Sequence, residues 1–392
     1  MDMPTHTRAA LRPPFAALRM ALGLLLAAHA GWACAGDAGV TPTEIRIGAS
    51  AVLSGPLGAQ TREYGVGSRM VFDAVNEQGG IFGRKIVYTT LDDGFDVKRA
   101  VENTRKLIHD DHVFMIYNNT GTGHTAAILP LLEESRTIVF GPVTGASSFR
   151  TQFNRHVFHV RASYANEARR IVTQLKLTGI TRIGAFYQDD IFGKTLLEEV
   201  RAAAAQENLK LTVEARVDPK QPDFKAAAAT MGGAAPQAVI LCTAGSTVPN
   251  FIKAMRQAGN KPGFYGFSVA SVDVINKILG PDAQGIVLAQ IMPSLKNTST
   301  PVVMEYQKLL ADKAADAAPS ASQFEGFVHA KLLVEGLRRA GKNLSTESFI
   351  KGMEAAGDIR FGRFVAAYSP QSHNGSSYVE LAIIDGNGQL RY

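Results

Sequence analysis

The chain has 392 residues, which is enough for about two domains. Its composition is 46% apolar and 19% charged, so it can form large hydrophobic cores and is not disordered throughout. The formal net charge is +6, with no dense run of lysine and arginine, so we expect no nucleic-acid partner.

The first 35 residues have the pattern of a secretory signal peptide. Three arginines precede an uncharged apolar run at 20–28, and small residues follow at 33–35. The run is shorter than the roughly 20 residues that span a bilayer. Removal of residues 1–35 would leave 38 Lys and Arg and 34 Asp and Glu, which is a net charge of +4. We therefore predict an exported protein.

The chain contains two cysteines. Cys34 falls at the predicted cleavage site. A lipid anchor on Cys34 is the alternative to its removal, but lipidation favours an aliphatic residue three positions earlier, where Gly31 stands. Cys242 ends an apolar segment, and we expect it to be a buried thiol.

The first half of the mature chain alternates β-rich segments with segments of helical periodicity. Expected strands are 44–52, 85–93, 112–118 and 137–142, and expected helices are 63–81, 97–111 and 122–134. Strands that alternate with helices of 10–15 residues favour parallel βαβ units.

The alternation then repeats. Expected strands are 182–190, 209–217, 237–245, 261–268 and 284–292, and the intervening helices begin near Phe192, Phe224, Thr247 and Val272. Three helices follow at 300–314, 322–341 and 345–357, and then a hairpin of 377–385 with 389–392. The two long helices, 300–314 and 322–341, have no neighbouring strand in the sequence. They must pack on a sheet formed elsewhere, and the first set of strands can provide it. We predict an α/β protein with two doubly wound lobes, between which the chain crosses more than once.

Ligands of open parallel sheets bind beyond the carboxyl ends of the strands. The loops there are rich in Gly, Ser and Thr. The candidate binding loops are Ser54–Gly55, 120–123, 142–145, 188–192, 243–246, which ends at Ser246, and the position of Ser268. Loop 120–123 also precedes a helix, and helix N-termini attract anions. These loops lack reactive side chains, which favours binding without reaction.

Catalytic motifs are weak or missing. Gly121, Gly123 and Ala126 fit G-x-G-x-x-A, but no carboxylate stands about 20 residues later to hold a ribose. The chain has no G-x-S-x-G or H-E-x-x-H motif. We expect no catalytic residue, metal or cofactor. An enzyme that uses His124 or Asp189 is the competing hypothesis.

Arg161 follows a short strand near the middle of the chain, just before a helix. If the chain crosses between lobes there, its guanidinium lies at the cleft. It then holds a ligand carboxylate or forms an interdomain salt bridge.

The segment from Glu44 to Ile86 resembles the opening of type I periplasmic solute-binding proteins, in particular the leucine/isoleucine/valine-binding family of ABC transporters. The shared motifs are S-G-P at 54–56, Tyr64-Gly65, A-x-N-x-x-G-G-I at 74–81 and L-D-D at 91–93, with GPVTGA at 141–146 and YQDDIFGK at 187–194.

This resemblance implies two lobes joined by three crossovers, with a ligand cleft between them. It assigns 43–160 plus 295–363 to lobe 1, and 161–294 plus 364–392 to lobe 2. It also implies a monomer in the periplasm that serves an ABC permease and ATPase complex at the inner membrane. A module that presents bound solute to a membrane receptor is the alternative.

The resemblance further implies the ligand contacts. A carboxylate cradle matches Gly121, Thr122, Val143, Thr144 and Gly145, and aromatic walls match Tyr64 and Phe192. Two departures stand out. Ser268 occupies the place of the Glu that holds a ligand ammonium in amino-acid binders, and Gly145 replaces a Thr. An acid without an amino group therefore competes with an amino acid as the ligand.

Overall fold

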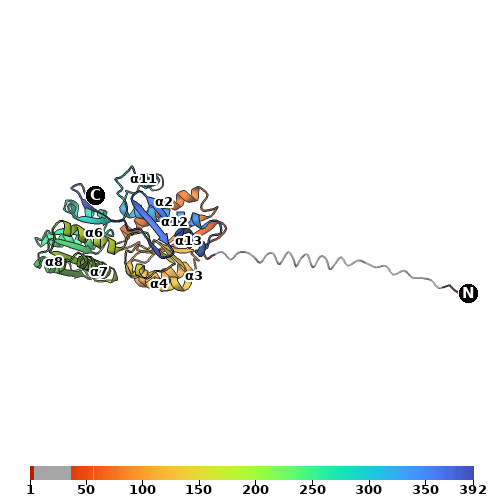
Figure 1. Ribbon diagram of the computed structural model, residues 1–392, viewed down its shortest axis with the longest axis horizontal. Coiled ribbons are helices and arrows are strands. Elements are labelled where there is room, and N and C mark those ends of the chain that lie inside the picture. Colours follow the sequence, from red (N-terminus) through yellow and green to blue (C-terminus); the bar gives the residue numbers. More distant parts are fainter. Residues whose placement is uncertain (4–36, 56) are drawn as a thin grey trace. The chain divides into compact units, whose positions relative to one another are not determined.

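Two parallel sheets organise the chain in the computed structural model, which describes residues 1–3, 37–55 and 57–392 (Figure 1). Residues 4–35 of the predicted signal peptide, with Cys34, lie outside the described residues. No described helix is long and apolar enough to cross a membrane.

The first sheet has five parallel strands in the order β2-β1-β3-β4-β5. They are β1 (Glu44–Ala51), β2 (Lys85–Asp92), β3 (Met115–Tyr117), β4 (Ile138–Phe140) and β5 (Val157–Phe158). The helices around it are α2 (Gly58–Glu77), α3 (Val97–His109), α4 (Thr122–Ser135), the short α5 (Ser148–Thr151), α11 (Pro301–Lys313), α12 (Ala321–Ala340) and α13 (Thr346–Glu354). Helix α12 packs closely on α2, as expected for a long helix that covers this sheet.

The second sheet has the order β15-β14-β10-β9-β8-β6-β7, in which only the pairs with β14 are antiparallel. Its strands are β6 (Ile183–Gln188), β7 (Leu211–Val217), β8 (Ala238–Cys242), β9 (Gly263–Gly266), β10 (Val287–Gln290), β14 (Glu380–Ile384) and β15 (Leu390–Arg391). Its helices are α6 (Tyr164–Leu177), α7 (Ile191–Gln206), α8 (Phe224–Gly233), α9 (Thr247–Gln257), α10 (Val272–Leu279) and the 3₁₀ turn η1 (Gly280–Ala283). The predicted hairpin is present as β14 and β15.

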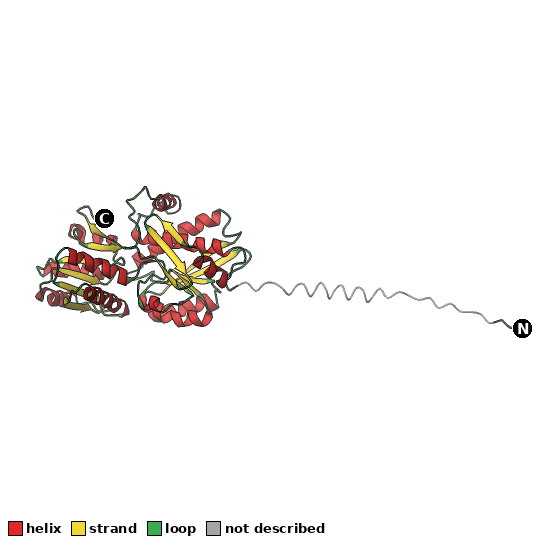
Figure 2. Cartoon of the chain, viewed as in Figure 1, coloured by secondary structure: helices red, strands yellow, loops and turns green. Residues whose placement is uncertain are grey.

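Both sheets are covered on both faces, as Figure 2 shows. In β8, Ala238, Ile240 and Cys242 face one hydrophobic cluster, and Val239 and Leu241 face another. A strand buried on both sides must be apolar throughout, which explains the continuous AVILC run. Cys242 is a fully buried free thiol, as predicted.

The chain crosses between the sheets three times, at 159–163, 291–300 and 376–379. The first and third crossovers lie side by side, because Ser376 N donates to the carbonyl oxygen of Val160 at 3.1 Å. The predicted fold of two doubly wound lobes with three crossovers is confirmed.

A small third sheet moves the expected lobe boundary. It consists of β11 (Asp358–Phe361), β12 (Phe364–Ser369) and β13 (Ser372–Gly375). We expected lobe 2 to resume at residue 364, but β12 pairs with β11 and packs into the core of the first sheet through Phe364, Ala366 and Tyr368. The return to the second sheet falls between β13 and β14. The sequence pattern missed this sheet because its strands are short and the third follows a tight turn.

Helices α2 and α12 approach each other closely at two glycines. A Cβ on Gly67 would lie 1.8 Å from the carbonyl oxygen of Gln323, and one on Gly326 would lie 2.1 Å from that of Tyr64. Only glycine fits such backbone contacts. This contact fixes the position of Tyr64 relative to α12.

We predict opposite effects for two glycine substitutions in α2. Gly67→Ala should lower the free energy of unfolding by about 1–3 kcal/mol, because the new methyl group forces the helices apart. Gly65→Ala is the matched control, since a Cβ there meets nothing within 4 Å, and it should raise that free energy by about 0.5–1 kcal/mol. Urea unfolding measures both. Equal effects would contradict the close packing of α2 on α12.

Candidate functional site

Loops at the carboxyl ends of both sheets surround a cavity of about 50 Å³ between the lobes. It is lined by Leu57, Gln60, Thr61, Tyr64, Phe95, Thr120, Gly121 and Val143 from the first lobe, and by Tyr164, Phe192, Ala244 and Val269 from the second. The predicted site residues Tyr64, Gly121, Val143 and Phe192 are therefore brought together here.

Two loops of the first lobe form the floor of the cavity. Gly121 N donates to the carbonyl oxygen of Val143 at 3.3 Å, and Val143 N donates to that of Asn119 at 2.8 Å. Gly121 has φ +104°, and a Cβ there would lie 2.6 Å from Nδ1 of His124, so this position requires glycine. We expected the Gly121 amide to face the ligand, but in this structure it bonds to Val143.

The two threonines of the predicted cradle contact each other. The hydroxyl oxygens of Thr122 and Thr144 lie 2.8 Å apart, and both side chains are buried. Thr122 is the first residue of α4, and the first amides of a helix have no partner within it. A helix terminus and a hydroxyl pair therefore meet beside the cavity. Gly145, in the same loop, accepts a hydrogen bond from Tyr164 N at 2.7 Å.

Aromatic rings from both lobes form the walls. Tyr64 comes from α2, and Phe192 comes from the first turn of α7. Tyr164 packs edge-to-face on Phe192, with ring centroids 6.1 Å apart. Sequence reasoning found Tyr64 and Phe192 but missed Tyr164.

Arg161 lies in the first crossover and is completely buried. Its Nη2 donates to Ser268 Oγ at 2.6 Å, and its Nη1 lies 3.6 Å from Glu325 Oε1 on α12. Ser268 donates through its backbone N and its hydroxyl to the two carboxylate oxygens of Glu167 on α6, at 2.7 and 3.1 Å. We call Arg161, Glu167, Ser268 and Glu325 the Arg161 network. One guanidinium thus serves carboxylates from both lobes.

The sequence left two roles open for Arg161, and the contacts are those of an interlobe ion pair. Neither Arg161 nor Ser268 lines the 50 Å³ cavity. The predicted ligand contact of Arg161 stays a prediction.

Burial sets the protonation of this network. Burial raises the pKa of Glu167 to about 7, although Arg161 and the hydrogen bonds from Ser268 oppose the rise. Burial also raises the pKa of Glu325, against the attraction of Arg161. The neighbouring His329 is neutral, because burial and the nearby Arg161 lower its pKa to about 3. The Arg161 network therefore contains two carboxyl groups, Glu167 and Glu325, whose pKa values burial raises.

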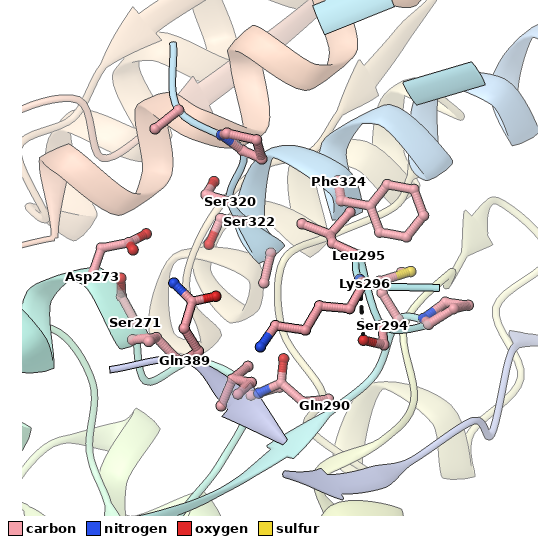
Figure 3. Close-up of a pocket in the computed structure, with 18 of the residues that line it drawn as sticks. Ser271, Asp273, Gln290, Ser294, Leu295, Lys296, Ser320, Ser322, Phe324 and Gln389 are labelled. Carbon is pink, nitrogen blue, oxygen red and sulfur yellow. Dashed lines mark hydrogen bonds between the residues drawn. The ribbon is translucent and has the colours of Figure 1, made fainter. Parts of the chain in front are cut away.

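Ser268 lines a larger cavity, of about 520 Å³, which Figure 3 shows. The start of α10, the second crossover and the N-terminal end of α12 surround it. Lys296 extends into it, and Asp273 lies at its edge. Neither of these two side chains has an ion-pair partner among the residues that the structure describes. This cavity is charged and hydroxyl-rich.

The remaining predicted residues lie outside the 50 Å³ cavity. Ser54 is exposed and donates to Asp92 Oδ2 at 2.7 Å. Ser246 is the N-cap residue of α9.

The two side chains of the enzyme hypothesis also lie outside it. His124 is buried against Phe95, with ring centroids 4.9 Å apart, and burial lowers its pKa although Asp93 opposes this. Asp189 forms exposed ion pairs with Lys194 and Arg216 at 2.7 and 3.0 Å.

The sequence carried a signal for two residues that we missed. Glu167 lies on the apolar face of α6, one turn before Ile171, and Glu325 stands between the core residues Phe324 and Phe327. A carboxylate on a buried helix face requires a partner. That rule would have connected both residues to Arg161.

Known proteins share this architecture. The family model described as periplasmic binding protein matches residues 44–389. A Leu/Ile/Val-binding protein homolog from Brucella melitensis is 21% identical over 346 residues, which cover 88% of this chain and 92% of the relative.

Solved structures agree. A substrate-binding periplasmic protein from Ralstonia solanacearum has 30% identity and a TM-score of 0.83 over 88% of this chain and 99% of that one. A possible leucine/isoleucine/valine-binding protein from Rhodopirellula baltica has 26% identity and a TM-score of 0.84 over 90% of this chain and 97% of that one.

We predict that Glu167 makes the fold less stable as pH rises. Its pKa of about 7 in the folded state lies above its ordinary value of 4.5. The folded state therefore binds the proton more tightly, and this contribution is complete below pH 4.5 and lost as pH rises through 7. It amounts to about 3 kcal/mol. Glu167→Gln should remove this pH dependence.

Urea unfolding at pH 5 and pH 8 measures the effect. The stability of Glu167→Gln relative to the natural protein should increase at pH 8. Glu102→Gln, on the exposed side of α3, is the control and should shift equally at both pH values. A Glu167→Gln difference that is the same at pH 5 and pH 8 would contradict the assignment.

Proposed function

Because this chain belongs to the periplasmic binding protein family, as a type I protein of the leucine/isoleucine/valine-binding kind, we propose that it captures a small carboxylate-bearing solute between its lobes and delivers it to an ABC importer. The family places it outside the cytoplasm and pairs it with a permease. We propose further that it works as a monomer.

The observation that carries this proposal is the meeting of the α4 terminus with the hydroxyl pair of Thr122 and Thr144. The residues before them, Gly121 and Val143, line the cavity together with the aromatic residues of the second lobe. A carboxylate suits the first amides of a helix, which have no partner within it, and the helix dipole adds to this attraction. The rings of Tyr164 and Phe192 suit an apolar body.

The size of the cavity supports capture by hinge motion. Small-molecule sites typically enclose about 300–1,000 Å³, whereas this cavity encloses about 50 Å³. A solute can enter only if the lobes move apart. The three crossovers provide the hinge, and the hydrogen bond from Gln60 Nε2 to the carbonyl oxygen of Val269, at 3.2 Å, is a contact that such motion would break.

Isothermal titration calorimetry with a broad panel of amino acids and small organic acids tests the proposal. At least one carboxylate should bind, and its amide or alcohol analogue should not. Failure of every acid in the panel would contradict the proposed function.

The threonine pair gives a sharper prediction. Thr122→Val keeps the shape of the side chain but removes the hydroxyl, so it should weaken binding of the captured acid at least tenfold, about 1.4 kcal/mol. Thr230→Val, on the exposed face of α8, is the matched control and should bind normally. Full affinity in Thr122→Val would show that the hydroxyl pair does not hold the ligand.

A further inference from the structure

The lining of the 50 Å³ cavity is neutral. Among the described residues that line it, none is Asp, Glu, Lys or Arg, and its polar side chains are Gln60, Thr61, Thr120 and the two tyrosines. An ammonium group that enters such a cavity loses its hydration and gains no opposite charge, which is costly.

Three carboxylates are buried next to lining residues, and each has a polar or charged neighbour, although Glu325 Oε1 has no hydrogen-bond partner among the described residues. Asp93 accepts hydrogen bonds from Ser50 Oγ at 2.8 Å and from Phe95 N at 3.0 Å. Glu167 accepts the two from Ser268, and Glu325 faces Arg161. None of the three lines the cavity, so none is placed to receive a charge from the ligand.

Arg161 supplies the positive charge beside the buried carboxylates that a ligand ammonium would otherwise supply. Its guanidinium lies between the carboxylates of the two lobes and donates to Ser268, the residue that stands where the resemblance expects a ligand-binding Glu. The charged groups that face Glu167 are Arg161, Arg150 and Glu325. Arg161 carries one positive charge and therefore balances only one of the two carboxylates. Burial raises the pKa of Glu167 to about 7, which favours the protonated, neutral form of the second.

We propose that the captured solute is a carboxylic acid without an amino group, with an apolar or aromatic body. This inference rests on the proposed function and specifies its substrate class. The rings in the lining suit a hydrocarbon, and the first amides of α4, which have no partner within the helix, lie beside the cavity. No acidic side chain of the lining offers a charge to an amine.

The 520 Å³ cavity differs from the 50 Å³ cavity in the charge of its lining. Asp273 and Lys296 give it both signs of charge. An amino acid would find an opposite charge for each of its groups there, but that cavity does not include the loops of Thr122 and Thr144.

Matched pairs of acids test the inference on the natural mature protein. 3-Phenylpropanoate is compared with L-phenylalanine, and 4-methylpentanoate with L-leucine, by calorimetry at one pH and salt concentration. In the pair that fits the cavity, the amine-free acid should bind at least a hundredfold more tightly. Equal or tighter binding of the amino acid would overturn the inference while the proposed function stands. If no small carboxylate binds at all, the proposed function itself fails.

A variant of the lining separates charge from fit. Gln60→Glu places a carboxylate in the cavity wall with almost no change of volume, and Gln60→Met removes the same amide without adding charge. The preference for the amine-free acid should fall at least tenfold in Gln60→Glu relative to Gln60→Met. The same preference in both variants would overturn the inference, because the missing acidic group would then not determine the choice.

Discussion

The buried guanidinium of Arg161 is the interaction on which the two-lobed structure depends. A charge removed from water is tolerated only when it is paired, and Arg161 is paired with Glu325 of one lobe and, through Ser268, with Glu167 of the other. Arg161 lies in a crossover, so the positive charge that pairs with carboxylates of both lobes is located at the hinge. Removal of one partner would leave the others buried and unpaired, which would destabilise the contact between the lobes.

The charged side chains of the Arg161 network lie outside the neighbouring cavity, which leaves the lining of that cavity neutral. The buried carboxylates lie outside the lining, which is neutral and rich in aromatic rings, and the α4 terminus and the threonine pair adjoin it through Gly121 and Val143. Burial in the interlobe contact raises the pKa of both Glu167 and Glu325.

The sequence predicted the architecture well because parallel strands buried on both faces are continuous apolar runs, such as AVILC in β8. Four of the residues predicted to bind the ligand, Tyr64, Gly121, Val143 and Phe192, line one cavity, and their role in binding stays a prediction. The sequence did not reveal β11–β13, whose strands are too short for a clear period. Glu167 and Glu325 escaped because their partner is distant in sequence, and the pairing of the Gly121 amide with Val143 depends on loop geometry that no local pattern encodes.

A crystal structure of the complex with the tightest-binding amine-free acid tests the central claim most directly. We expect the ligand carboxylate to lie against α4 and the hydroxyls of Thr122 and Thr144, while Arg161 keeps its contacts with Ser268 and Glu325. A ligand carboxylate bound to the Arg161 guanidinium, with Glu325 or Glu167 displaced, would contradict it.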